Sequence, residues 1–387
     1  MRPLERRLAW SNPNVRAIVY QVVAVGAVAS LVWFLIDNTL RNLDSRHIAT
    51  GFGFLSSPAG FEIAEAPIDY SPEDSYGRAI LVGLLNTLRV AGIGIVFASV
   101  LGAVIGISRL SPNWILRHLA AGYVEAVRNT PLLLQLLLWY AVVSENLPGL
   151  RDALHPLPGV LLSNRGLNVP ALTGASVDWF LLGLLGACIA SVGLAFWARR
   201  QRERTGRIRS VWPLAAALMV LMPGAASVLG GADIRIELPR LEGFGIEGGW
   251  SLSPELFALL AGLVLYTAGF IAEIVRAGIQ SINKGQWEAA GSLGLSRARM
   301  LRLIVLPQAL RVIIPPLTSQ YLNLVKNSSL AVAVGYRDVV SVVNTTLNQT
   351  GQAIEGILII MGVYLTLSLS IALVMNWYNG RMALAER

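Results

Sequence analysis

Polar and charged side chains stand inside two long apolar stretches of the sequence, residues 119–143 and 312–334. Such groups are costly in hydrocarbon, so by default they face the interior of a helix bundle or a water-filled cavity. Cations, a carboxylate and amides placed together could solvate both ends of a small zwitterion. The candidates for such a polar pathway are Glu125, Arg128, Gln135, Asn323, Lys326 and Asn327.

The depth of these groups follows from the centre of each stretch. The second stretch centres near Asn323, which predicts Lys326 about 4–5 Å from the membrane midplane. The first stretch centres near Pro131, which predicts Arg128 and Gln135 about 5–6 Å to either side of the midplane. Pro131 is also expected to kink its helix.

A structural interpretation competes with the pathway. Glu125 and Arg128 are three residues apart, a spacing at which opposite charges meet on one helix. Glu273 and Arg276 have the same spacing, nearer the cytoplasmic end of their stretch. Arg89 also lies inside an apolar stretch, where it could line a pathway or contact a partner subunit. Both interpretations remain open at this point.

A second group of residues lies between two apolar stretches, in a polar loop. Its members are Glu288, Ala289, Ala290, Gly294, Arg297, Leu306 and Pro307. Helix-forming residues with little bulk favour a short surface helix that inserts into a groove of a partner. Gly294 permits a sharp turn after that helix. Glu288 would offer its charge to a basic residue of the partner.

The remainder of this loop predicts a second helix. Ser296 is suited to cap its start, and Pro307 is expected to interrupt the helix before the next apolar stretch. Arg297, Arg299 and Arg302 could contact anionic lipid headgroups. An ordinary positively charged loop would leave the spacing of the whole group unexplained.

A membrane framework must position these residues. Hydrophobic residues make up 54% of the 387 residues and charged residues only 14%. A stretch of roughly 20 apolar residues is long enough to cross a bilayer as a helix. The qualifying stretches are 17–36, 80–107, 119–143, 179–197, 211–229, 254–279, 312–334 and 353–377. The sequence therefore predicts an all-α polytopic membrane protein with about eight transmembrane helices.

Arginines gather in alternate loops, as the positive-inside rule requires. With the amino terminus inside, residues 2–16, 109–117, 199–209 and 297–302 are cytoplasmic, and the first outer loop is acidic. An even number of helices also returns the carboxyl terminus to the cytoplasm. Membrane topology thus accounts for the net charge of +8, and nucleic acid is not a predicted partner. The first apolar core exceeds the roughly 7–15 residues of a signal peptide, which predicts an uncleaved span.

The chain divides into three predicted parts. Residues 1–79 hold the first helix and an outer loop whose aromatic and turn residues predict an ordered structure. Residues 80–378 form the transmembrane domain, which contains a two-helix insertion at 145–253 and the Glu288 loop at 280–307. Residues 379–387 form a cytoplasmic tail.

No pattern for catalysis, metal binding or nucleotide binding stands out. Cys188 is the only cysteine, which excludes disulfides within the chain. Neither Lys284 nor Lys326 lies in the glycine-rich context of a phosphate-binding loop. The histidines are scattered among loops and helix ends: His47, His118 and His155. We predict no catalytic residue, no metal site and no cofactor in this chain, so ATP would have to be bound by a partner.

Three stretches resemble the polar amino-acid uptake permeases, namely Tyr123 to Gln135, Phe270 to Gly278 and Gln320 to Leu330. The spacing from Glu288 to Pro307 resembles the EAA loop of ABC importer permeases, which docks on a separate ATPase. The insertion and residues Thr50 to Leu55 are similar to the first of two permeases in the general L-amino-acid ABC systems of Gram-negative bacteria. The resemblance covers nearly the whole chain.

The resemblance implies a type I importer transmembrane domain with a five-helix core in a bacterial inner membrane. It also implies a periplasmic binding protein, a second homologous permease and a pair of cytoplasmic ATPases. Transport would proceed by alternating access. The resemblance favours a heterodimeric pore, although the residues alone leave a homodimer open. Because the binding protein would do most of the selecting, the amino acids carried stay open too.

Two other functions compete with this interpretation. An ion-coupled secondary amino-acid transporter could use Glu125, Arg128 and Lys326 as a proton relay, and it would transport without partners. It leaves the spacing from Glu288 to Pro307 unexplained. A membrane-embedded enzyme would need clustered catalytic groups, and the sequence shows no such spacing.

Overall fold

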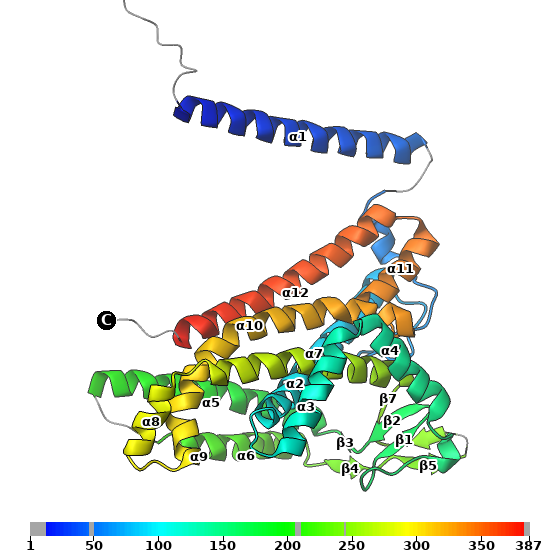
Figure 1. The fold of residues 1–387 in the computed structure, drawn as a ribbon. Helices are drawn as coiled ribbons and strands as arrows, with labels where there is room; N and C mark the ends of the chain where they lie inside the picture. The colour runs from blue at the N-terminus through cyan, green and yellow to red at the C-terminus, as the bar shows by residue number, and fades with distance from the viewer. Residues whose placement is uncertain (1–12, 46–49, 206–209, 244, 383–387) are drawn as a thin grey trace, which may run out of the picture. The chain divides into compact units, whose positions relative to one another are not determined.

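The computed structural model describes residues 13–45, 50–205, 210–243 and 245–382 (Figure 1). Of the residues used above, 2–12, His47, 206–209 and 383–387 lie outside the described part, as do the side chains of Arg199, Arg202, Arg297 and Arg381. The described α-helices are α1 Pro13–Ser45, α2 Tyr76–Ser108, α3 Trp114–Asn129, α4 Leu132–Ala141, α5 Val177–Thr205, α6 Trp212–Leu229, α7 Pro254–Gln280, α8 Lys284–Ser292, α9 Arg297–Met300, α10 Leu306–Asn327, α11 Val339–Thr350 and α12 Ala353–Met382.

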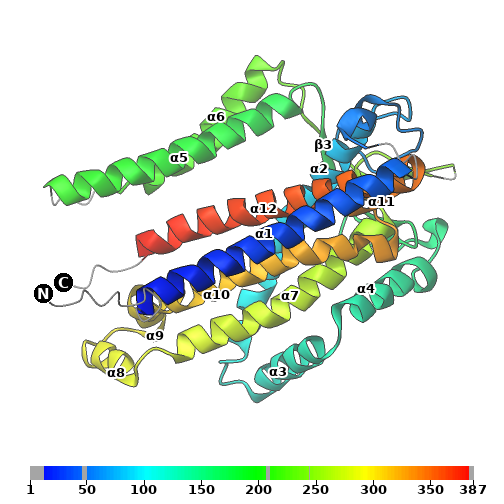
Figure 2. The same cartoon turned by 90° about the horizontal axis from the view of Figure 1, so that it is seen from above.

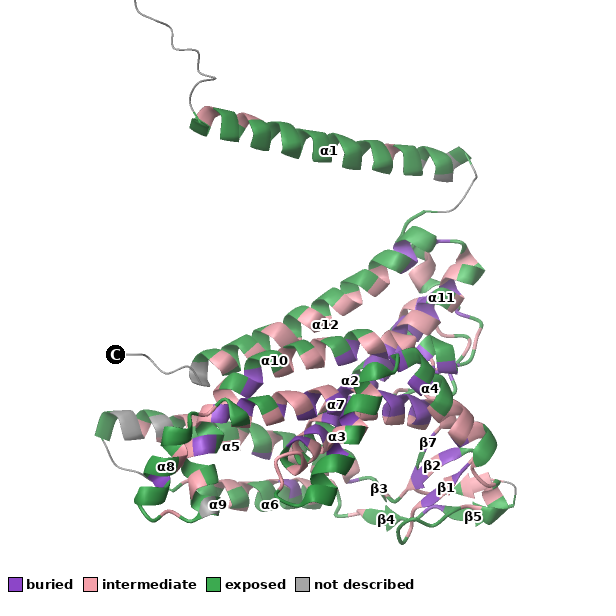
Figure 3. Ribbon diagram, in the orientation of Figure 1, coloured by how far each residue is buried: buried purple, intermediate pink, exposed green. Residues whose placement is uncertain are grey.

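Seven of the described helices are long and apolar enough to cross a membrane, or eight if the bent pair of α3 and α4 forms one span. This confirms the predicted helical membrane fold with about eight spans. The apolar side chains of α1 are largely exposed (Figure 3), as lipid-facing side chains would be. α12 runs on to Met382, so it includes the first residues of the predicted tail.

The third predicted span, 119–143, is not straight, and this corrects the depth estimate made for Arg128 and Gln135. Its two halves, Trp114–Asn129 and Leu132–Asn146, are bent by 107° at the break. Thr130 is extended, with φ −108° and ψ 131°, because a proline disfavours the helical conformation in the residue before it. Pro131 therefore breaks the span, where the sequence predicted only a kink.

The described residues form two compact units, one of those up to Asn86 with Arg337–Leu367 and one of those in Thr87–Tyr336 with those from Ser368 onward. In the first unit, Ile63, Tyr76 and Val82 pack with Val339 and Val343 of α11 in one buried cluster. This cluster includes residues of the first outer loop, which confirms that the loop is ordered from residue 50 onward. The predicted division after residue 79 falls inside α2.

Polar contacts fix the outer loop within this first unit. The side-chain amide of Asn86 donates to the carbonyl oxygens of Glu65 (2.8 Å) and Arg337 (2.9 Å). The Tyr76 hydroxyl donates to the Gln349 side chain at 2.8 Å. These bonds satisfy polar groups whose burial would otherwise be costly.

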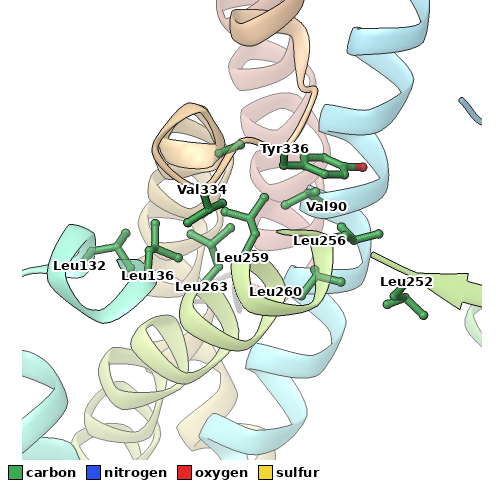
Figure 4. Packing of buried hydrophobic residues seen from close by; sticks show 11 residues of the cluster. Val90, Leu132, Leu136, Leu252, Leu256, Leu259, Leu260, Leu263, Val334 and Tyr336 are labelled. Atoms are coloured by element: carbon green, nitrogen blue, oxygen red, sulfur yellow. The ribbon is translucent and has the colours of Figure 1, made fainter. Parts of the chain in front are cut away.

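In the second unit, α7 is the central helix. It packs against α3, α4 and α10, and buried residues run along it (Figure 3). Leu259 and Leu263 of α7 pack with Leu136 of α4 in one buried cluster (Figure 4). Small residues let helices approach closely in membranes. On α2, Gly102 and Gly106 lie against α7 so closely that an added Cβ would come within 2.6 Å of it.

The predicted insertion contains a helical hairpin and short strands. α5 and α6 pack mainly on each other. The sheets join the loop before α5 to the loop after α6 in antiparallel register: β1 Leu161–Ser163 with β2 Gly166–Val169 with β7 Trp250–Leu252, and β3 Ala171–Thr173 with β4 Arg235–Glu237. β5 Arg240–Glu242 pairs with β6 Gly245–Glu247. The sequence analysis did not predict these strands, because three or four residues show too little alternation to be recognised.

Candidate functional site

The loop that carries Glu288 folds as a helix, a glycine turn and a second helix. The Asn283 side chain caps α8 by accepting the backbone N–H of Gly285 at 2.9 Å. α8 ends at Ser292, and Gly294 has φ +70°, a left-handed conformation that glycine adopts without steric cost. α9 begins directly after Ser296. The structure thus forms both helices that the sequence predicted here.

The three consecutive residues Glu288, Ala289 and Ala290 of α8 do not all face outward. Glu288 and Ala289 are exposed, as is Leu293 directly after the helix, which is 78% exposed. Ala290 is only 1% exposed, and Trp287 is half-buried. α8 therefore has an outer face of Glu288, Ala289 and Leu293 and an inner face of Trp287 and Ala290.

Pro307 does not interrupt the helix before the next span, and the prediction that it would is wrong. The five residues before α10 form a π-helical segment, η5 Leu301–Val305, and the helix continues through Leu306 and Pro307 into α10. A proline lacks an N–H and clashes with the carbonyl group of residue i−4 in a regular α-helix. The wider π turn supplies the local distortion that lets Pro307 occupy the first turn of α10. Leu306 and Pro307 are both exposed.

Two of the three predicted pathway residues of α10, Asn323 and Lys326, lie along one side of that helix together with Ser319, which the sequence analysis did not name. Ser319, Asn323 and Lys326 are exposed and follow one another at intervals of four and three residues. The other side of α10 is buried, with Leu324 and Val325 close to fully enclosed. Asn327 is half-buried. We call Ser319, Asn323 and Lys326 the polar stripe of α10.

The predicted pathway residues of the bent pair have different surroundings. Glu125 and Arg128 are exposed on α3, and neither forms an ion pair within the described part of the chain. The Arg128 guanidinium carbon lies 5.4 Å from the Phe270 ring centroid. Gln135 is buried, and its amide nitrogen donates to the carbonyl oxygens of Val127 (2.9 Å) and Thr130 (3.1 Å). These carbonyls lie at the end of α3, where helix carbonyls lack partners, so the Gln135 amide stabilises the bend.

The six predicted residues thus lie on the bent pair and on α10. Both pack against α7, which lies between α10 and α3 in Figures 1 and 2. This chain by itself therefore does not bring all six predicted pathway residues into one cluster. The polar stripe of α10 and the exposed charges of α3 form two separate surfaces.

The Glu273 and Arg276 pair predicted on α7 is confirmed. The Arg276 Nε donates to Glu273 at 3.2 Å, and Arg109 also pairs with the Glu273 carboxylate. Arg109, directly after α2, was missed as a partner because the contact joins residues 164 positions apart. Arg89, whose role was open, lies with its guanidinium carbon 4.7 Å from the Trp250 ring centroid. This is a cation–π contact between α2 and strand β7.

Comparison with known proteins gives the family of the chain. Residues 94–384 match the family described as "Binding-protein-dependent transport system inner membrane component". The chain belongs to this family, because the match covers more than half of its length. It is therefore the membrane component of a transport system that depends on a binding protein, as the resemblance implied.

Curated relatives match the chain almost from end to end. One is a putative amino-acid ABC transporter permease protein of Escherichia coli, YhdX, which is 52% identical over 98% of this chain and 97% of its own. Another is the general L-amino acid transport system permease protein AapQ of Rhizobium johnstonii, with 46% identity over 98% and 96%. A third is the glutamate/glutamine/aspartate/asparagine transport system permease protein BztB of Rhodobacter capsulatus, with 40% identity over 97% and 96%. These relatives give the ion-coupled carrier no support.

Proposed function

We propose that this chain is one permease subunit of an ABC importer that moves L-amino acids from the periplasm to the cytoplasm by alternating access. The printed names of the three relatives above support the substrate class, and each is similar to this chain over nearly its full length. In this proposal ATP is bound by a separate cytoplasmic ATPase dimer, and a periplasmic protein delivers the amino acid. The membrane is a bacterial inner membrane, with both termini in the cytoplasm.

The outer face of α8 carries the proposal. Glu288 and Ala289 are exposed beside Leu293, so α8 offers a carboxylate, a small residue and an apolar side chain to a groove on the ATPase. The helix begins at an Asn283 cap and ends at the Gly294 turn. In the proposal, closure of the ATPase dimer moves this short helix, and α9 and η5 transmit the movement to α10.

The polar stripe of α10 supports the position of the translocation pathway. An ammonium group facing hydrocarbon costs about 2.5–3.5 kcal/mol or more, and Lys326 is exposed on the single chain. A second permease packed beside α10 would place Lys326 and Asn323 in a polar space between the subunits. In this arrangement Lys326 meets the carboxylate of the amino acid. The second permease is a different, homologous chain in our proposal, as the resemblance favours.

Amino-acid-stimulated ATP hydrolysis tests the proposal. The assay uses proteoliposomes with this chain, the second permease, the ATPase dimer and the binding protein, and a set of L-amino acids that includes glutamate and glutamine. Glu288→Lys is expected to reduce stimulated hydrolysis at least about tenfold, or ~1.4 kcal/mol, with the complex still assembled. Glu73→Lys reverses another exposed charge and is expected to leave hydrolysis unchanged.

Unchanged stimulation in Glu288→Lys would contradict the proposed role of α8. Uptake by this chain alone, driven by a proton gradient, would replace the importer with the ion-coupled transporter.

A further inference from the structure

A cavity of about 640 Å³ lies on the inner side of the segment formed by α8, α9 and η5. Trp287 lines it from α8, Leu301, Arg302 and Val305 line it from η5, and Ile107 and Leu116 line it from the ends of α2 and α3. We call it the α8 cavity. Its volume falls within the roughly 300–1,000 Å³ of cavities that hold a small ligand. All its lining residues belong to the second unit.

The chemistry of the α8 cavity is that of an acidic amphiphile. Its wall is almost entirely apolar, and Arg302 is the only charged residue among the described residues that line it. Arg302 is exposed, and no acidic side chain of the described residues forms an ion pair with it. An apolar wall with one cation suits a hydrocarbon chain that ends in an anionic group. Neither a free amino acid nor a nucleotide would cover so much apolar surface.

The position of the cavity favours a lipid over the ATPase as the occupant. Ile107, Leu116 and Ile279 stand at the ends of membrane helices, the level of the lipid headgroups, where tryptophans such as Trp287 are also enriched. Trp287 and Ala290 form the inner face of α8, whereas Glu288 and Ala289 form the outer face that the ATPase would contact. The two faces of one helix thus meet two different partners.

We propose that the α8 cavity binds an acyl chain of an anionic phospholipid from the cytoplasmic leaflet, whose phosphate contacts Arg302. This inference rests on the proposed function for the membrane level and cytoplasmic side of α8. The bound lipid packs against Trp287 and η5, so it stabilises the segment formed by α8, α9 and η5. The lipid content of the membrane then affects how efficiently the ATPase drives α10.

Photolabelling of the assembled transporter tests the lipid site. Vesicles of phosphatidylcholine contain a phosphatidylglycerol with a photoreactive acyl chain, and labelled peptides are mapped by mass spectrometry. We expect the labelled phosphatidylglycerol to modify residues 107–116 and 298–306 more strongly than it modifies the lipid-exposed helix α6. Phosphatidylcholine with the same photoreactive chain is expected to modify these residues no more strongly than α6. Arg302→Gln is expected to reduce the labelling about fivefold.

Two further variants complete the design. Ala298→Trp fills the cavity from α9 and is expected to remove the labelling while Arg302 remains. Arg200→Gln removes an exposed arginine at the end of α5 and is expected to change nothing. Equal labelling by both lipids, or full labelling in Arg302→Gln, would overturn the site. Labelling that appears only when the ATPase is omitted would assign the cavity to the ATPase.

The labelling needs no ATP turnover, so its result is independent of the hydrolysis assay. A labelled cavity together with normal coupling in Glu288→Lys would contradict the proposed role of α8 and leave the lipid site standing. An unlabelled cavity together with lost coupling in Glu288→Lys would defeat the lipid site alone.

Discussion

α6 and α10 both expose one side of a membrane helix, but the exposed side chains differ in kind. On α6, Val220 and Leu221 are 72% and 66% exposed, and the exposed side chains at mid-helix are apolar. On α10, the exposed side includes Ser319, Asn323 and Lys326. Lipid chains can cover the apolar surface of α6 at no cost, whereas the polar side chains of α10 would be costly in contact with lipid chains. Exposure in a single membrane chain therefore identifies a partner surface only when the exposed groups are polar.

Val220→Lys tests the lipid-facing surface of α6 and has the largest expected effect. Val220 lies at the middle of α6, where a lysine facing lipid costs about 2.5–3.5 kcal/mol. We expect this variant to reduce the amount of folded protein in the membrane severalfold, as measured by fluorescence of a fusion after detergent extraction and size exclusion. Val220→Leu serves as the control and is expected to behave as wild type. A normal yield of Val220→Lys would show that α6 faces water or a polar partner.

Gly183→Leu tests whether the other side of the hairpin is a packed interface. A Cβ at Gly183 of α5 would lie 2.7 Å from the Ala226 Cβ and 2.8 Å from the Met222 carbonyl oxygen of α6. We expect the free energy of unfolding to fall by about 1–3 kcal/mol, the usual cost of overpacking. The fall would be seen as a lower thermal unfolding temperature in detergent. A Cβ at Gly193 would have no described heavy atom within 4 Å, so Gly193→Leu should unfold as wild type does. Equal unfolding of the two variants would contradict the α5 and α6 packing.

Lys326→Met tests the polar stripe of α10. If Lys326 faces a polar pathway, loss of its charge should lower amino-acid uptake about tenfold, or ~1.4 kcal/mol, without lowering the amount of protein in the membrane. Lys326→Arg keeps a cation and should keep most of the uptake. Uptake unaffected in Lys326→Met would remove Lys326 from the pathway.

Asp338 is a buried polar group, in contrast to the exposed ones above, and the effect expected from it is the smallest. The side chain accepts the backbone N–H of Ser341 at 2.8 Å at the start of α11, and burial raises the pKa of Asp338 to about 7. The folded state therefore binds a proton more tightly than the unfolded state, so the free energy of unfolding falls as pH rises toward 7. Between pH 6 and pH 8 we expect a fall of about 1 kcal/mol. Asp338→Asn should show a smaller fall in a denaturation series, and an equal fall would contradict the assignment.

The spans could be predicted from the sequence because a bilayer demands long apolar helices. The break at Pro131 could be predicted only as a kink. Its 107° angle depends on the Gln135 amide, which bonds to carbonyl groups at the end of α3. That contact forms only once the chain has bent, so the spacing of residues does not reveal it.

The loop that carries Glu288 was likewise predictable in part. The residues of α8 and the turn at Gly294 follow from local preferences, and both were predicted. Which of the residues Glu288, Ala289 and Ala290 is buried depends on the packing of Ala290 against the rest of the unit. The π turn before Pro307 likewise has no signature in residue types. The functional roles of these residues stay predictions until they are measured.

Thiol accessibility at two positions tests whether the polar stripe of α10 lines the pathway. Cys188 is the only cysteine of the chain, so a Cys188→Ser background accepts single cysteines at Lys326 and at Val220. In the assembled transporter, a water-soluble thiol reagent should modify the cysteine at 326, transported amino acid should slow that reaction, and the cysteine at 220 should not react. An unreactive cysteine at 326, or equal reaction at both positions, would show that the polar stripe of α10 does not line the pathway.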